Sequence, residues 1–253
     1  MANKRNQNGG RHRGAMIYTP VAALLVLFIV IFGVSVFFRV ATIEVSGSSR
    51  YTSDEIIAAS GIEAGDNLFL IDRDAAALRI KSAMPYIADI RIDPAIPDKA
   101  VIIVTESAAF AAIGTSGDYW KVDAAGRILE RSDFLGTSGL IRVTGVTLAA
   151  PKEGAKLAVD SAFDTQLGFL LDVFSAIDKA GIGGDVSELD ISNISAITFI
   201  YKGNITVKLG GGDNAEHKIS KLLATITELA ELEAGASGTI DVSKDDMRSF
   251  IPN

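Results

Sequence analysis

Cysteine is absent from the 253 residues, and histidine occurs only twice. Without cysteine the protein has no disulfide framework, no thiolate nucleophile, no cysteine-bound metal and no lipoprotein-type lipid attachment. His12 lies in a basic N-terminal segment, so a Ser-His-Asp arrangement in the rest of the chain has only His217 to use. His217 stands between Glu216 and Lys218, which favours a solvated position near a helix start. One histidine also cannot build a histidine-rich metal site.

The signature motifs of several enzyme classes are missing as well. No serine precedes a lysine by three positions, as in penicillin-binding enzymes, and no H-E-x-x-H pair occurs. The run Gly210–Gly212 lacks the lysine and hydroxyl residue of a phosphate-binding loop, and Asp213 after it repels anions. The acids Asp245–Asp246, and Asp72 with Asp74, are typical of solvated turns or helix starts. We therefore predict no catalytic, cofactor or metal site, and no enzyme activity.

Charge is absent from the run that begins at Ile17 and ends at Phe38. At about 1.5 Å per residue this run extends roughly 33 Å as a helix, which matches a bilayer hydrocarbon core about 30 Å thick. We predict that residues 17–38 form a single transmembrane helix that holds the chain in a lipid bilayer. A cleaved signal peptide is the alternative, but its apolar stretch is shorter and ends in small residues, whereas this run ends in Val36-Phe37-Phe38-Arg39.

The charges on the two sides of this run differ in sign. Residues 1–39 contain five basic residues and no acid, which leaves 19 basic and 31 acidic residues, a net charge of −12, for residues 40–253. Basic flanks stay in the cytoplasm, so residues 1–16 are predicted to be a cytoplasmic tail and the bulk of the chain to be extracytoplasmic. Nucleic acid is not expected as a partner, because an acidic surface repels phosphates.

Residues 40–113 begin with the signals of two short helices. Thr52 and Glu55 form a capping box, and Gly61 stands where a helix end needs left-handed backbone geometry. Asp72 is positioned to cap a second helix, which Pro85 stops.

Strand patterns surround these two helices. Val40–Val45 alternates as a half-buried strand does, Tyr86–Ile92 and the β-branched Val101–Thr105 read as two more strands, and Pro94–Asp98 reads as a turn. The predicted order is β-α-α-β-β, directly after a single hydrophobic helix, and it resembles the POTRA domain.

Four stretches sharpen this resemblance to one family, the bacterial division proteins FtsQ, called DivIB in Gram-positive bacteria. They are Ile43-Glu44-Val45-Ser46-Gly47, Gly65-Asp66-Asn67-Leu68-Phe69, Pro85-Tyr86-Ile87, and Pro97-Asp98 leading to Glu106. One departure follows Glu106. Family members usually continue with Arg and, two positions later, Pro, whereas this chain has Ser107 and Ala109.

Residues 114–253 show a second, β-rich pattern with two amphipathic helices. Trp120–Leu129 and Ile197–Leu209 each read as a hairpin, the second one antiparallel, and Leu140–Gly145 reads as a further strand. The helices carry apolar residues at helical spacing, which are Phe163, Leu167, Leu170, Leu171, Phe174 and Ile177 in the first and Ile219, Leu222, Leu223, Ile226 and Leu229 in the second.

The chain is predicted to close with Thr239–Ser243 as its final short strand. This helix-then-strand ending, with Lys218 and Lys221 on the helix and Ile240–Val242 after it, again resembles the FtsQ/DivIB family. The expected fold class is therefore α+β: a transmembrane helix, a POTRA domain over residues 40–113 and an FtsQ/DivIB-like β domain over residues 114–253.

The resemblance implies a non-enzymatic scaffold of the divisome, anchored in the bacterial cytoplasmic membrane and located at the division septum. There it is expected to recruit FtsB/DivIC-like and FtsL-like proteins for septal peptidoglycan synthesis. An exposed strand edge offers unpaired N–H and C=O groups, so strand addition is the natural binding mechanism.

The resemblance places the partner on the last strand and the segment after it, with five candidate residues: Ile240, Val242, Lys244, Arg248 and Phe250. Lys244, Arg248 and Phe250 are expected to supply specificity. In the alternative interpretation, Ile240 and Val242 simply pack inward and Lys244 is a solubilising charge at the sheet edge.

Two other functions remain open. An envelope chaperone with POTRA domains generally carries several such units and a barrel of alternating strands about 10 residues long, and this sequence shows neither pattern. An anchored cell-wall enzyme needs a nucleophile or a metal, and the residues considered above supply neither.

Overall fold

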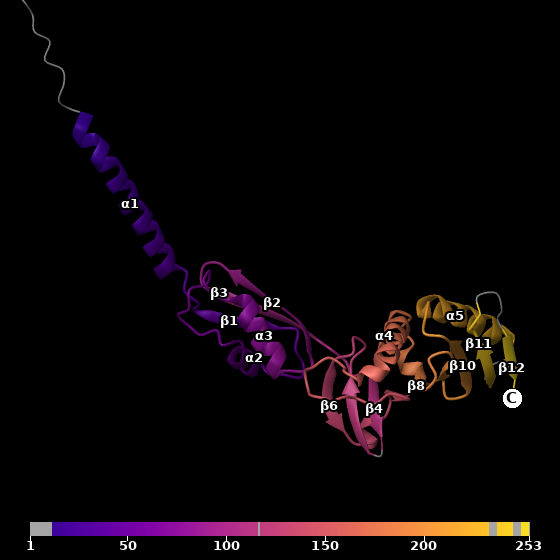
Figure 1. Ribbon diagram of the computed structural model, residues 1–253. Coiled ribbons are helices and arrows are strands. Elements are labelled where there is room, and N and C mark those ends of the chain that lie inside the picture. Colours follow the sequence, from indigo (N-terminus) through magenta and orange to yellow (C-terminus); the bar gives the residue numbers. More distant parts are fainter. Residues whose placement is uncertain (1–11, 116, 233–236, 245–248, 253) are drawn as a thin grey trace, which may run out of the picture. The chain divides into compact units, whose positions relative to one another are not determined.

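The computed structural model of the protein describes residues 12–115, 117–232, 237–244 and 249–252. The chain forms two compact units. Unit 1 comprises Met1–Ile80 with Ile90–Val104, and unit 2 comprises Lys81–Asp89 with Thr105–Asn253. The helices and strands of both units are labelled in Figure 1.

The first sheet has three strands and two accompanying helices (Figure 1). The elements in chain order are β1 (Thr42–Ser46), α2 (Ser53–Ser60), α3 (Arg73–Ala83), β2 (Ile87–Ala95) and β3 (Lys99–Glu106). Strand β3 is central, and β1 pairs with it in parallel, with Thr42 opposite Lys99. The predicted β-α-α-β-β order is confirmed, although β2 continues through Pro94, which was predicted to lie in a turn.

The predicted helix caps are present. Thr52 Oγ1 accepts a hydrogen bond from Glu55 N (3.3 Å), and the Glu55 carboxylate accepts one from Thr52 N (2.8 Å). The bond from Thr52 N is the main cause that lowers the pKa of Glu55, and a bond from Thr52 Oγ1 to the same carboxylate (2.8 Å) is the second. Gly61 ends α2 with φ 63°, and Asp72 Oδ1 accepts from Ala75 N at 3.0 Å. The residues that begin and end these helices were therefore readable from the sequence.

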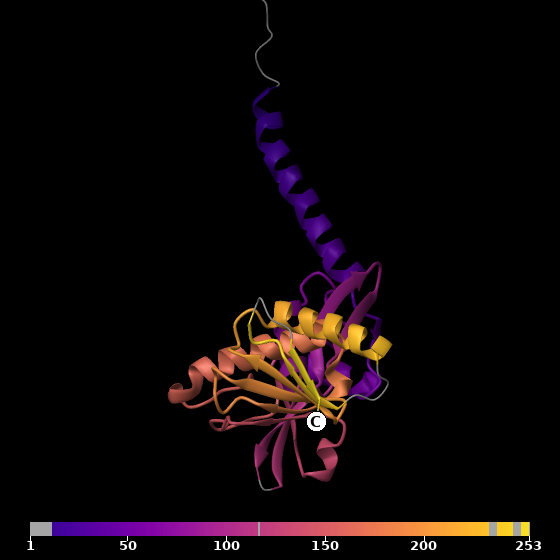
Figure 2. The ribbon, with the colours of Figure 1, turned by 90° about the vertical axis from the view of Figure 1, so that its right-hand side faces the viewer.

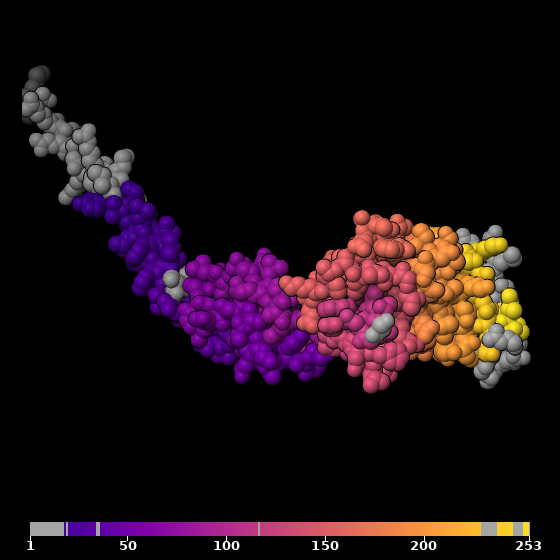
Figure 3. All heavy atoms as spheres, turned by 60° about the horizontal axis from the view of Figure 1, so that its bottom comes forward, coloured from indigo at the N-terminus to yellow at the C-terminus, as the bar shows by residue number. Residues whose placement is uncertain are grey.

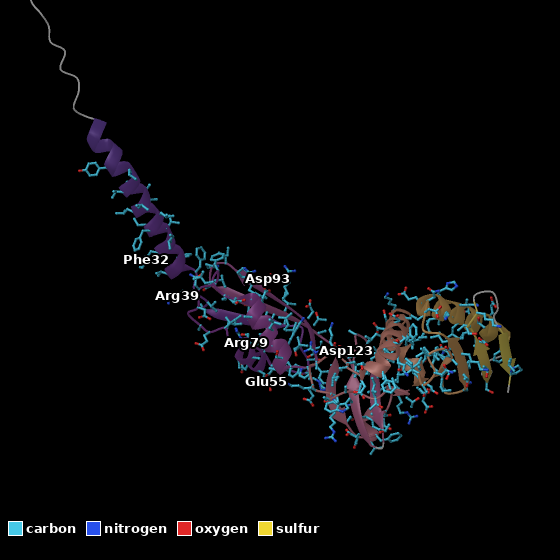
Figure 4. All side chains as sticks on the ribbon, viewed as in Figure 1. Phe32, Arg39, Glu55, Arg79, Asp93 and Asp123 are labelled. Atoms are coloured by element: carbon cyan, nitrogen blue, oxygen red, sulfur yellow. The ribbon has the colours of Figure 1, made fainter. Side chains whose placement is uncertain are left out.

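Helix α1 (His12–Phe37) precedes this sheet and contains Pro20. Its described apolar side chains are exposed, including Leu24, Phe28 and Phe32, the last of which is labelled in Figure 4. Among the residues that the structure describes, no helix is both long and apolar enough to cross a membrane.

Unit 2 contains a nine-stranded sheet in the order β12-β11-β10-β9-β8-β7-β4-β5-β6. Its strands are β4 (Ala111–Thr115), β5 (Asp118–Val122), β6 (Ile128–Ser132), β7 (Ile141–Thr144), β8 (Val186–Asp190), β9 (Ile197–Tyr201), β10 (Ile205–Gly210), β11 (Gly238–Asp241) and β12 (Ser249–Pro252). The sheet is mixed, because β4·β7, β7·β8 and β10·β11 pair in parallel and the other described pairs are antiparallel.

Two long helices, α4 (Asp164–Lys179) and α5 (Ala215–Leu232), lie on one face of this sheet (Figure 2). Their apolar stripes bury Phe174, Leu170 and Leu222 completely, against sheet residues such as Phe199 and Val207. The two predicted amphipathic helices are thus confirmed, and the main core of unit 2 lies between them and the sheet. Strands β4, β8 and β12 were not predicted.

Candidate functional site

The C-terminal end of the large sheet differs from the prediction in one respect. The strand predicted to be the last one is β11, but β11 lies between two neighbours. It pairs in parallel with β10, where Ile240 is opposite Val207, and antiparallel with β12, where Ile240 is opposite Phe250. The prediction of Thr239–Ser243 as the final strand was therefore wrong, because the residues after it return as β12 and occupy its outer side.

The side chains of Ile240 and Val242 point into the core. Their exposed fractions are 0 % and 1 %, and both belong to the cluster formed with α4 and α5. These two residues pack inward, as the alternative interpretation stated. A partner cannot contact their side chains while the sheet is intact.

The other three candidate residues follow β11 in the chain. Lys244 is exposed, and its main-chain carbonyl accepts a hydrogen bond from Lys221 Nζ on α5. Phe250 is partly buried against the core from its place on β12. Arg248 lies outside the described residues. The structure therefore brings Phe250 to the outermost strand, beside the buried Ile240.

Strand β12 forms one outer edge of the sheet. One of its sides pairs with β11, and among the described residues no strand pairs with the other side. Ile251 on this strand is 58 % exposed. In Figure 3 the C-terminal residues, coloured yellow, form the end of unit 2. An apolar side chain and an unpaired strand side thus occur together at this edge.

Close backbone packing fixes β12 against β11. A Cβ atom at Gly238 would lie 2.4 Å from the carbonyl oxygen of Ile251, far inside van der Waals contact. Only glycine lets the two strands approach this closely. Gly238 was not singled out from the sequence, and nothing in the local pattern marks it.

A side-chain turn ends β11. Asp241 Oδ1 accepts hydrogen bonds from Ser243 N (2.9 Å) and Ser243 Oγ (2.6 Å). The bond from the Ser243 hydroxyl is the main cause that lowers the pKa of Asp241. Val242 N donates to Lys208 O at 3.0 Å, so the turn is also tied to β10. These bonds direct the chain out of β11 before it returns as β12.

The described residues considered for chemistry do not belong to β11 or β12. His217 is an exposed residue of the first turn of α5. No group of three or more metal-ligating side chains occurs among the described residues. Asp123 (Figure 4) is buried, but its carboxylate accepts hydrogen bonds from Ser107 Oγ (2.8 Å), Ala125 N (3.0 Å) and Arg127 N (2.8 Å). Ser107, the departure from the family pattern, thus holds a structural carboxylate.

Comparison with known proteins identifies both parts of the chain. Residues 38–107 match the model of the FtsQ-type POTRA domain, and residues 111–245 match that of the C-terminal region of the cell division protein FtsQ/DivIB.

Curated relatives agree with these matches. Cell division protein DivIB of Clostridium tetani is 26 % identical over 82 % of this chain and 77 % of its own length, and DivIB of Clostridium botulinum strain Hall is 27 % identical over 88 % of each. Cell division protein FtsQ of Syntrophotalea carbinolica is 29 % identical over 74 % of this chain and 64 % of its own length. The chain belongs to the FtsQ/DivIB family of cell division proteins.

Proposed function

We propose that this protein is a non-enzymatic scaffold of the bacterial divisome, which recruits FtsB/DivIC-like and FtsL-like proteins for septal peptidoglycan synthesis. The observation that carries the proposal is the outer side of β12, which pairs with no strand among the described residues. A strand of a partner gains main-chain hydrogen bonds there, and alternate side chains give specificity.

The residues that we propose for this contact differ from those expected from the sequence. Ile251 and Phe250 lie on the edge strand, and Lys244 and Arg248 flank it in the sequence. Ile240 and Val242 act indirectly, because they hold β11 in the core and so support β12. The proposed binding surface is therefore β12 with its flanks, and β11 is its support.

We also propose that residues 17–38 anchor the chain in the cytoplasmic membrane, with residues 1–16 in the cytoplasm. The uncharged run falls almost entirely within helix α1, and the basic residues precede it. Several side chains of the run lie outside the described ones, so the sequence carries this part of the proposal. The septum is the proposed location.

Cross-linking tests the binding mode, because the chain has no cysteine of its own. In the full-length chain, Ile251→Cys is combined with a cysteine scan through the FtsB/DivIC-like partner. Strand addition predicts disulfides at every second partner position, since side chains alternate between the two faces of a sheet. Arg131→Cys on β6 is the matched control and should form none.

Two results would count against the proposed binding mode. Cross-links at a spacing of three to four partner positions would indicate a docked helix. Cross-links that form equally well from Arg131→Cys would show that β12 has no special role. The divisome role itself is tested by imaging a fluorescent fusion: midcell rings support it, and a uniform peripheral signal contradicts it.

A further inference from the structure

Two loops of unit 1 are hydrogen-bonded to the residues that directly follow α1. In the first loop, Leu68 N donates to Phe38 O (2.9 Å) and Val40 N donates to Asp66 O (2.8 Å). In the second, Asp98 O accepts from Ala41 N at 2.7 Å. Both loops therefore lie within a few residues of the end of α1 at Phe37, beside Arg39, which Figure 4 labels.

These loops expose large apolar side chains. Phe69 and Leu70 in the first loop are 45 % and 79 % exposed, and Ile96 in the second is 67 % exposed. We call these three residues the apolar rim. Phe37, the last residue of α1, is 68 % exposed as well. The apolar surface thus continues from the helix onto the folded part of unit 1.

The first loop is built to hold its apolar residues outward. Leu68 is buried (1 %) beside Val40, and this anchors the loop. Asn67 Oδ1 accepts from Phe69 N (3.0 Å) and Asn67 O accepts from Leu70 N (2.9 Å), which closes a turn directly after it. The rings of Phe38 and Phe69 pack edge to face, with centroids 5.1 Å apart. A fixed turn of this kind presents Phe69 and Leu70 in a defined direction.

We propose that the apolar rim inserts into the interfacial layer of the lipid bilayer beside the anchor. This inference rests on the proposed anchoring by residues 17–38. If that run lies in the bilayer, the main-chain bonds to Phe38 and Ala41 place both loops next to the membrane surface. Exposed apolar side chains at that depth leave water, and aromatic rings favour the interfacial layer. The rim then gives unit 1 a second membrane contact and limits its rotation about the end of α1.

Site-specific fluorescence quenching tests this proposal in the full-length chain reconstituted into phosphatidylcholine and phosphatidylglycerol nanodiscs. Single cysteines are introduced by Leu70→Cys, Ile96→Cys, Phe28→Cys and Leu135→Cys, and each is labelled with the same small fluorophore. Nitroxide groups are placed on the lipids either near the headgroups or deep in the acyl chains. Leu135 in unit 2 is the matched control, because it is 79 % exposed, as Leu70 is.

The labels at Leu70 and Ile96 are expected to lose most of their emission to the shallow quencher and little to the deep one. The label at Phe28 should be quenched by the deep one, and the label at Leu135 by neither. An unquenched Phe28 label would overturn the anchor and with it the rim. A quenched Phe28 label with unquenched Leu70 and Ile96 labels would overturn the rim alone.

Two further outcomes also contradict the rim. Equal quenching at Leu135 would show that any exposed label reaches the lipid. A change in the emission of the Leu70 label that occurs only when the FtsB/DivIC-like or FtsL-like protein is added would show that the apolar rim contacts a protein and not the lipid.

Discussion

The two outer strands of the large sheet, β6 and β12, differ in how they are protected. Arg131 on β6 pairs with Asp118 (2.7 Å), and Glu130 pairs with Lys121 (2.7 Å), so charge lies along this edge. The first residue of β6 is also covered, because Ile128 exchanges hydrogen bonds with Gly154 N and Ala155 O, both at 2.8 Å.

Strand β12 has neither kind of protection among its described residues. Its final residues are Phe250, Ile251 and Pro252, and no ion pair of the described residues involves them. Charged side chains and covering segments are the usual means by which proteins prevent unwanted strand pairing. Among the described residues, charge and a covering segment protect the β6 edge and neither protects the β12 edge, which agrees with the proposed recruitment of a partner at β12.

The largest expected effect comes from the strand that supports the open edge. Ile240→Ala leaves a cavity under β11 and β12, and we expect it to lower the free energy of unfolding by about 2–5 kcal/mol. Ile251→Ala on β12 should change it by less than about 0.5 kcal/mol, because Ile251 is largely exposed. Urea denaturation measures both. If both variants lose the same free energy of unfolding, Ile251 on β12 contributes as much to the core as Ile240 on β11. The distinction between a supporting strand and an exposed edge strand would then be wrong.

This end of the sheet also shows what the sequence could and could not predict. The alternation of Thr239–Ser243 predicted a strand correctly, but no local pattern states which strand will pair with it. Four residues, Ser249–Pro252, are too short a run for periodicity to be recognised. The assignment of the candidate residues to partner binding stays a prediction, and their division into core and edge required the structure.

The other missed strands have physical reasons of their own. In β4, Ala111, Ala112 and Ile113 are all fully buried, so no alternation remains, and alanine has a low strand propensity. In β8 the pairing register shifts between Val186 and Glu188, which breaks the period of two. Caps, hairpins and amphipathic helices were predictable because their signals are local.

The next effect in size comes from the contact between β11 and β12. Gly238→Ala places a Cβ atom 2.4 Å from Ile251 O, and we expect β12 to shift at a cost of about 1–3 kcal/mol, with a parallel loss of partner binding. Gly168→Ala on α4 is the control, since a Cβ atom there meets nothing within 4 Å. Gly168→Ala should raise the free energy of unfolding by about 0.5–1 kcal/mol. Denaturation and a pull-down assay give the two readouts, and intact binding by Gly238→Ala would argue against β12 as the docking strand.

A smaller effect is expected at the turn after β11. Asp241→Ala removes the acceptor of two Ser243 bonds and should cost about 0.5–1.5 kcal/mol at pH 7. The pKa of Asp241 is lowered from 3.8, so its contribution to stability is complete above that pH and is lost as the pH falls through the lower folded pKa. Denaturation at pH 7 and pH 3 should therefore show that the unaltered protein and Asp241→Ala differ less in their free energy of unfolding at pH 3. Asp241→Asn keeps an acceptor oxygen and should recover part of the loss. A difference that grows toward low pH would contradict this assignment.

The smallest effect on stability is expected at the protected edge, where association is the informative measurement. Glu130→Val with Arg131→Val removes two ion pairs of β6, the exposed one between Arg131 and Asp118 and the partly buried one between Lys121 and Glu130. Ion pairs at a protein surface contribute about 0–1 kcal/mol each. Valine suits a strand, so the free energy of unfolding should stay within about 1 kcal/mol of the original. Without these charges β6 resembles β12, and we expect concentration-dependent self-association in sedimentation velocity experiments. If the double variant sediments as the unaltered protein does, these charges do not prevent strand pairing at β6. The segment at Gly154 and Ala155 that covers Ile128 would then be the physical difference between β6 and β12.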